Sequence, residues 1–141
     1  MGKINWNRVF LGGLLFAVVG NILWVAALMV YLNTEVGAAW KALGLQFPRT
    51  PGFLVFWLAL SYVAGVVAIW LYAAIRPRYG PGPKTGVGAG LAFWFIGNFL
   101  PMIFLGASGV FPARFVAVDT ATELVAIVVA TLAGAWLYKE E

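Results

Sequence analysis

The 141-residue chain contains no cysteine and no histidine. Without cysteine there are no disulfides and no thiol chemistry, and without histidine the usual general base and the usual physiological pH switch are missing. Haem ligation by histidine and nearly every zinc site are excluded for the same reason. We therefore expect no metal site, no cofactor and no catalytic residues.

Charged residues are also scarce, at 10% of the chain against about 25% in soluble domains. Hydrophobic residues make up 63%, and the mean hydropathy is +0.94. A soluble fold this short could not bury so much apolar surface, because small domains bury only about two-thirds of what their chains expose. The composition predicts an integral membrane protein whose partner is the lipid bilayer, with no nucleic-acid partner.

Four stretches are long and apolar enough to cross a bilayer, at about residues 9–32, 53–75, 86–108 and 115–138. Each is close to the roughly 20 residues that a 30 Å hydrocarbon core requires. Backbone groups in lipid must pair internally, and the alternating segments of a β-barrel are absent, so the spans are predicted to be helices. The first run is too long for the apolar core of a signal peptide, and we expect it to be retained. The predicted fold is all-α, a four-helix bundle forming one transmembrane domain over residues 1–141.

The distribution of lysine and arginine predicts the orientation, because cytoplasmic loops carry an excess of both. One side of the predicted topology collects Lys3, Arg8, Arg76, Arg78, Lys84 and Lys139, and the other has Lys41, Arg49 and Arg114. Both termini are therefore predicted to be cytoplasmic. The loop that holds Arg76, Arg78 and Lys84 lacks the glycine and the preceding strand of a phosphate-binding loop, so we interpret it as a basic cytoplasmic loop that touches anionic lipid.

The first outer connection, residues 33–52, carries apolar side chains at helical spacing. Asn33 or Thr34 could cap such a helix, and Gly44 could end it. The pattern predicts a short helix lying flat in the outer interface, with a plain loop as the alternative.

Two segments resemble each other: GLLFAVVGNIL at residues 13–23 and GLAFWFIGNFL at residues 90–100 share six of eleven residues in place. Both shared motifs contain a Gly-Asn pair in mid-span. The match suggests two parallel repeated hairpins, related by an axis along the membrane normal. Chance likeness among membrane residues is the alternative, and the second and fourth spans show no comparable match.

Polar residues inside the spans are the candidate site. An ionisable side chain in a membrane helix costs about 2.5–3.5 kcal/mol on insertion scales and is by default a functional hypothesis. Asp119 and Glu123 lie four apart on one face of the fourth span, at depths of roughly 6 and 12 Å. Asn21 and Asn98 fall at about the depth of Glu123. We predict an intramembrane polar cluster of these four residues.

Small residues suggest which helix faces pack together, because they allow close approach in membranes. In the fourth span Ala126, Ala130 and Gly134 share a stripe with the two acids, which predicts that the acids point into the bundle. The candidate packing residues of the other spans are Gly13 and Gly20 in the first and Gly86, Gly90 and Gly97 in the third. Pro101 cannot donate to the carbonyl of Gly97, which would leave that oxygen available beside Asn98.

The polar cluster has two readings. The asparagines could simply hold helices together through hydrogen bonds worth about 0.6–2 kcal/mol, with Asp119 stabilised by the helix dipole or paired with Arg114. The cluster could instead bind a cation, a proton, a small substrate or a lipid head group.

The segments YAAIRPRYGPGPKTG, GNFLP, GAWLYKE and INWNRVFLGG resemble a group of uncharacterised small bacterial membrane proteins with four spans. The resemblance covers most of the chain and implies a bacterial inner-membrane location but no activity. Small multidrug transporters are similar in layout alone, since their single glutamate lies in the first span.

Three functions follow as hypotheses. The first is a non-enzymatic membrane module or accessory subunit, self-associating or bound to a membrane partner, in which the polar cluster is structural. The second is a small transporter or channel with its site at the bilayer midplane. The third is a protein that binds a lipid or another hydrophobic ligand.

Overall fold

The computed structural model describes residues 3–139, and within that range every regular element is a helix. Four continuous helical segments of the described chain are long and apolar enough to cross a membrane: Trp6–Ala42, Pro51–Tyr79, Pro83–Ala107 and Ala113–Leu137. The predicted all-α fold with four spans is confirmed. Length and composition of these helices make the chain a multi-pass membrane protein.

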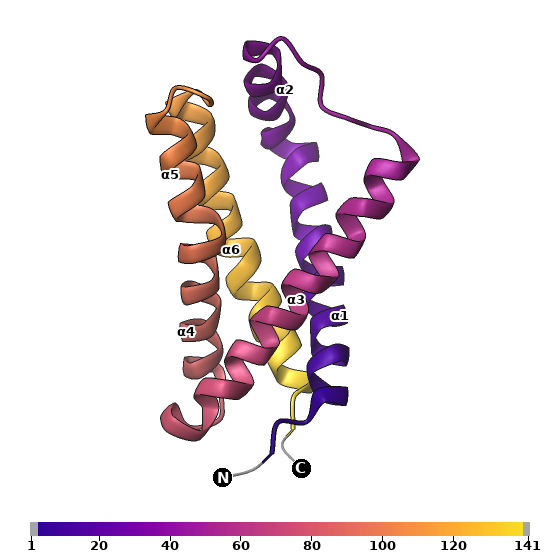
Figure 1. Cartoon of the computed structure of the whole chain (residues 1–141), viewed down its shortest axis with the longest axis vertical. Helices are drawn as coiled ribbons and strands as arrows, with labels where there is room; N and C mark the ends of the chain where they lie inside the picture. The colour runs from indigo at the N-terminus through magenta and orange to yellow at the C-terminus, as the bar shows by residue number, and fades with distance from the viewer. Residues whose placement is uncertain (1–2, 140–141) are drawn as a thin grey trace.

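The first helix is longer than predicted. It runs through α1 (Trp6–Ala27), a π-helical turn η1 (Leu28–Leu32) and α2 (Asn33–Ala42) without a break (Figure 1). At 1.5 Å per residue it is roughly 55 Å long, so α2 extends beyond a 30 Å hydrocarbon core. The first outer connection is therefore helical as predicted, but α2 continues α1 and is not a separate helix lying flat in the interface. Neither Asn33 nor Thr34 caps it, because the backbone of Leu32 is already helical. Gly44 follows its last turn with φ +70°.

The second span, α3 (Pro51–Tyr79), is bounded by sequence signals that act locally. Thr50 caps its start by accepting a hydrogen bond from the Phe53 N–H at 3.2 Å. Gly80, with φ +83°, ends it. Arg76 and Arg78, predicted in a loop, instead lie in its last turn, where positive charge is favoured by the helix dipole.

The third span combines α4 (Pro83–Trp94), the π-helical turn η2 (Phe95–Phe99) and α5 (Leu100–Ala107). Lys84, the third residue of the predicted basic loop, belongs to the first turn of α4. The π-turn directly precedes Pro101, which lacks the N–H that a regular helix would use at this point. Local widening of the helix is a common way to accommodate a proline within a membrane span.

The fourth span, α6 (Ala113–Leu137), follows a tight turn that contains Gly109 at φ +75°. The four spans alternate in direction, so that α1 begins and α6 ends at the same end of the bundle (Figure 1). There the backbone N–H of Asn5 donates to the hydroxyl of Tyr138 at 3.3 Å. We refer to this end as the terminal end and to the opposite one, where α2 lies, as the loop end.

Glycines allow close crossings near the terminal end. A Cβ placed on Gly12 of α1 would lie 2.7 Å from the carbonyl oxygen of Gly134 in α6, and one on Gly13 would lie 2.7 Å from the backbone nitrogen of Val66 in α3. Between the third and fourth spans, Gly90 packs similarly against Val128. Gly13 and Gly90, equivalent in the repeated segments, thus each pack against the second helix of their own hairpin.

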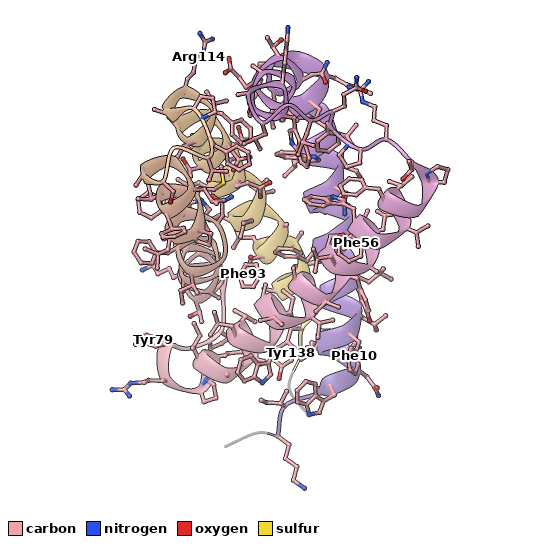
Figure 2. All side chains as sticks on the ribbon, turned by 45° about the horizontal axis from the view of Figure 1, so that its top comes forward. Phe10, Phe56, Tyr79, Phe93, Arg114 and Tyr138 are labelled. Atoms are coloured by element: carbon pink, nitrogen blue, oxygen red, sulfur yellow. The ribbon has the colours of Figure 1, made fainter. Side chains whose placement is uncertain are left out.

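Buried side chains form one core near each end and a small central one. The terminal-end core is Val9, Ile69, Tyr72, Ala73, Ala89, Ala135 and Tyr138. Large apolar side chains such as Phe10 and Phe56 lie on the outside of the bundle, 46% and 61% exposed (Figure 2). An apolar exterior around a small interior is expected of a bundle whose solvent is lipid.

Candidate functional site

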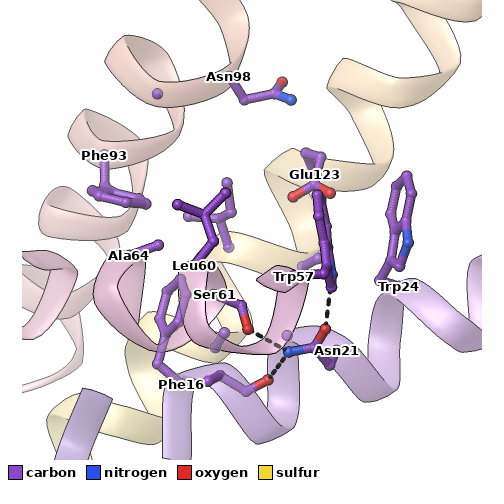
Figure 3. A pocket seen from close by; sticks show the side chains of 16 residues that line it. Phe16, Asn21, Trp24, Trp57, Leu60, Ser61, Ala64, Phe93, Asn98 and Glu123 are labelled. Atoms are coloured by element: carbon purple, nitrogen blue, oxygen red, sulfur yellow. Dashed lines mark hydrogen bonds between the residues drawn. The ribbon is translucent and has the colours of Figure 1, made fainter. Parts of the chain in front are cut away.

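A pocket of about 280 Å³ lies halfway along the bundle and is lined by all four spans. Its aromatic lining residues are Phe16 and Trp24 of α1, Trp57 of α3 and Phe93 of α4. Its polar lining residues are Asn21, Ser61, Asn98 and Glu123. Figure 3 shows these side chains converging from separate helices. Three of the four residues of the predicted polar cluster therefore share one pocket.

The Asn21 side chain is fully used in joining α1 to α3 (Figure 3). Its Nδ2 donates to the carbonyl of Ala17 and to the hydroxyl of Ser61, both at 2.8 Å. Its Oδ1 accepts from the indole N–H of Trp57 at 3.0 Å. Both donors and the acceptor are satisfied within the protein, so the Asn21 side chain stabilises the packing of α1 against α3 at the pocket wall.

Asn98 is only half satisfied. Its Nδ2 donates to the Asp119 carboxylate at 3.1 Å, which joins the third span to the fourth. Its Oδ1 is shielded from solvent and has no hydrogen-bond partner among residues 3–139. A buried polar atom without a partner is uncommon in proteins and costs about 1–3 kcal/mol. Asn98 therefore has a buried acceptor without a partner in the described part of the chain.

The two acids of α6 have different surroundings. Asp119 is 6% exposed, bonds Asn98 and does not line the pocket. Glu123, one turn further along the helix, extends into the pocket (Figure 3). No hydrogen bond or ion pair joins its carboxylate to another side chain in the described part of the chain, residues 3–139. Among the described residues that line the cavity, Glu123 is the only one with an ionisable acid or base.

Arg114 does not pair with Asp119. Its Nε lies 2.8 Å from a carboxylate oxygen of Glu35, at the loop end. This pairing is possible because α2 continues the first helix and brings Glu35 beside the start of α6. The Arg114 side chain is exposed there. The predicted pairing is wrong because it did not take into account that the first helix continues as far as Ala42.

The small residues occupy several different environments. Ala126 and Ala130 are buried and line the pocket, and Gly20 of α1 is in ordinary contact with Ala130. Gly86 packs tightly against Leu132, and Gly134 packs against Gly12 as described above. Gly97 differs from all of these.

Gly97 lines the pocket, and a Cβ added to it would meet no atom within 4 Å. It is a packing residue in the sequence-based prediction but not in the structure. Its position inside the π-turn η2 explains the error, because the wider turn changes which face the residue occupies.

Two pocket residues, Trp57 and Ser61, were not among the sequence-predicted site residues. They lie four apart on α3 and both bond Asn21. Their i,i+4 spacing places them on one helix face. This spacing is the sequence feature from which a shared polar contact could have been predicted. Only the crossing of α1 and α3 shows that this face meets Asn21.

The basic residues of the terminal end lie away from the pocket. The guanidinium of Arg76 sits over the Tyr138 ring, 5.6 Å from its centroid. Arg78 and Lys84 are exposed. Within residues 3–139, no group of three or more Asp, Glu, His or Cys side chains is arranged to hold a metal ion.

Comparisons of this chain with protein-family models, curated proteins and solved structures find no match. The fold and the pocket define the class: a multi-pass helical membrane protein with a polar pocket between its spans.

Proposed function

We propose that this chain is a membrane-embedded binding protein that holds a small, largely apolar ligand between its four spans and does not transform it. One observation carries the proposal: a pocket of about 280 Å³ into which the unpartnered carboxylate of Glu123 extends. An intramembrane ionisable side chain that faces a cavity is a typical feature of a binding site.

The size and lining of the pocket support a small ligand. Ligand sites usually measure roughly 300–1,000 Å³ and are mostly apolar with a few polar groups. A cavity of about 150 Å³ already binds benzene. The present pocket is nearly twice that size and offers aromatic surfaces from Trp24, Trp57, Phe16 and Phe93.

The contrast between Asn21 and Glu123 also supports binding. A polar group that only holds helices together should be bonded to a neighbouring helix, as Asn21 is to Ser61. Glu123 has no such bond, although burial of an unpaired charge is costly. The cost is understandable if a ligand pairs with the carboxylate.

We further propose that the protein resides in a bacterial inner membrane with both termini in the cytoplasm. Six lysines and arginines of the sequence belong to the terminal end, against three at the loop end, which is the bias expected of cytoplasmic loops.

A purely structural module or accessory subunit is the second candidate function. The saturated hydrogen bonds of Asn21 and the Asn98–Asp119 bond favour it, because both join neighbouring helices. Such a module could self-associate or bind a membrane partner through its apolar exterior. A purely structural role does not explain why the Glu123 carboxylate lacks a hydrogen-bond partner in the described part of the chain.

The test uses a neutral probe that quenches tryptophan fluorescence by contact, 2-(4-bromophenyl)ethanol. The full chain in nanodiscs of zwitterionic lipid should show saturable quenching that is reduced by Trp57→Phe. Gly97→Leu should abolish the saturable part, because the new side chain projects into the pocket. Ala64→Leu fills the same pocket from α3 and serves as a second filling variant.

Gly88→Leu is the matched control, because Gly88 lies on the same span with equally open space but does not line the pocket. It should bind the probe like the wild type. Quenching that never saturates, or that both filling variants leave unchanged, would show that the pocket does not bind such ligands and would leave the structural module as the better account.

A further inference from the structure

The charge balance around Glu123 is incomplete. The lysines and arginines of the described chain belong to the two ends of the bundle and none lines the pocket. Arg114, the nearest in sequence, is already paired with Glu35 at 2.8 Å. Asp119, one turn away on the same helix, is a second acidic side chain and supplies no positive group. A carboxylate in a low-dielectric site is stable when a positive group joins it.

Several hydrogen-bond donors around the pocket are already used within the protein. The Trp57 indole N–H donates to Asn21, the Asn21 amide donates to Ser61, and the Ser61 hydroxyl donates to the Leu58 carbonyl at 2.9 Å. The Nδ2 of Asn98 is used by Asp119. The two oxygens of Glu123 and the buried Oδ1 of Asn98 accept no hydrogen bond from residues 3–139. A hydrogen-bond donor on a ligand can therefore pair with the Glu123 carboxylate.

The aromatic walls are also suited to a cation. The rings of Trp24 and Trp57 lie 6.3 Å apart at an interplanar angle of 31°, and Phe16 and Phe93 meet edge to face at 6.1 Å. Aromatic faces attract cations, tryptophan most strongly, and the attraction grows when water is excluded. The same walls give apolar contact to the body of a ligand.

We propose that the ligand is an organic monocation: a protonated amine on an aromatic or apolar body that is small enough for the pocket. The ammonium group binds the Glu123 carboxylate, and the body lies against Trp24 and Trp57. This inference rests on the proposed binding function. An ammonium has three N–H donors, and two of them can pair with the two oxygens of Glu123. Hard divalent cations would require about six to eight oxygen ligands, more than these side chains provide.

The test compares two probes of nearly equal shape, 2-(4-bromophenyl)ethylamine and 2-(4-bromophenyl)ethanol. The wild-type chain in zwitterionic nanodiscs should bind the amine about tenfold more tightly or better, because a charge-assisted pair is stronger in a low-dielectric site. Glu123→Gln should remove this preference, so that the two probes bind with affinities within about twofold of each other. Glu35→Gln, the same substitution at a carboxylate outside the pocket, is the control and should retain the preference.

The outcomes separate this inference from the proposed function. If both probes bind equally and Gly97→Leu blocks both, the pocket binds neutral ligands and the cation inference is wrong. An amine preference that survives Glu123→Gln is also against it, because the preference would then arise elsewhere. If neither probe gives saturable quenching, the proposed binding function and the inference are both wrong.

Discussion

Asn98 donates a 3.1 Å hydrogen bond to the carboxylate of Asp119, so that the two acids of α6 differ in their surroundings. Asp119 is enclosed between the third and fourth spans and is used within the protein. Glu123, one turn away, remains directed into the pocket. The bond also fixes the Asn98 amide so that its oxygen stays without a donor.

The Asn98–Asp119 bond makes a prediction about stability. Asn98→Leu should lower the free energy of unfolding by about 1–3 kcal/mol, because it leaves a buried carboxylate without its donor. Asp119→Asn should cost less or even stabilise the protein, since it keeps an acceptor oxygen and removes a buried charge. Unfolding in mixed detergent micelles measures both. A larger loss for Asp119→Asn than for Asn98→Leu would contradict this account of the bond.

The Asn21 network predicts a graded response. Asn21→Leu removes three hydrogen bonds between and within α1 and α3, each worth about 0.6–1.7 kcal/mol in membrane proteins. Ser61→Ala removes one of them. Thermal unfolding in detergent should therefore rank Asn21→Leu as clearly more destabilising than Ser61→Ala. Equal effects would show that the network does not hold these helices together.

The glycine crossing of α1 and α3 predicts a sharp difference between two alanine substitutions in one helix. Gly13→Ala would bring a Cβ to 2.7 Å from the backbone nitrogen of Val66 and should cost about 1–3 kcal/mol. Gly20→Ala would meet the Ala130 Cβ at 3.7 Å, an ordinary contact, and should change stability by less than about 0.5 kcal/mol. The prediction fails if the two variants unfold alike.

Orientation can be tested with single cysteines, because the chain has none of its own. Lys41 and Lys84 are both exposed and lie at opposite ends of the bundle. A membrane-impermeant maleimide added to intact cells should label Lys41→Cys and should reach Lys84→Cys only after permeabilisation. The reverse labelling would place the termini outside.

The sequence predicted the number of spans because a long apolar run has few alternatives in lipid. It did not predict that α1 continues into α2. Asn33 and Thr34 are residue types that often cap the start of a helix. Here they do not start a new helix, because the residues before them remain helical and no proline or glycine intervenes. The ends of α3 were misjudged for a related reason, since Pro77 lies inside its last turn without stopping it.

The candidate site was predictable in part. Ala126, Ala130 and Gly134 share a helix face with Glu123, and this pattern anticipates the inward direction of the carboxylate. The environment of Gly97 was not predictable from regular helical spacing, because the π-turn changes the register there. Nor does the sequence indicate that Asp119 bonds Asn98 while Arg114 bonds Glu35, since both pairs depend on how separate spans meet.

The central claim is that the pocket between the four spans takes an amine on Glu123, and the bromine atom of 2-(4-bromophenyl)ethylamine allows the most direct measurement. An experimental structure of the complex, with the bromine located by anomalous scattering, should show the atom inside the pocket beside Trp57 and the amine nitrogen within hydrogen-bond distance of the Glu123 carboxylate. Bromine found only on the lipid-facing surface, with Glu123 bonded to a neighbouring helix across a filled pocket, would contradict the claim.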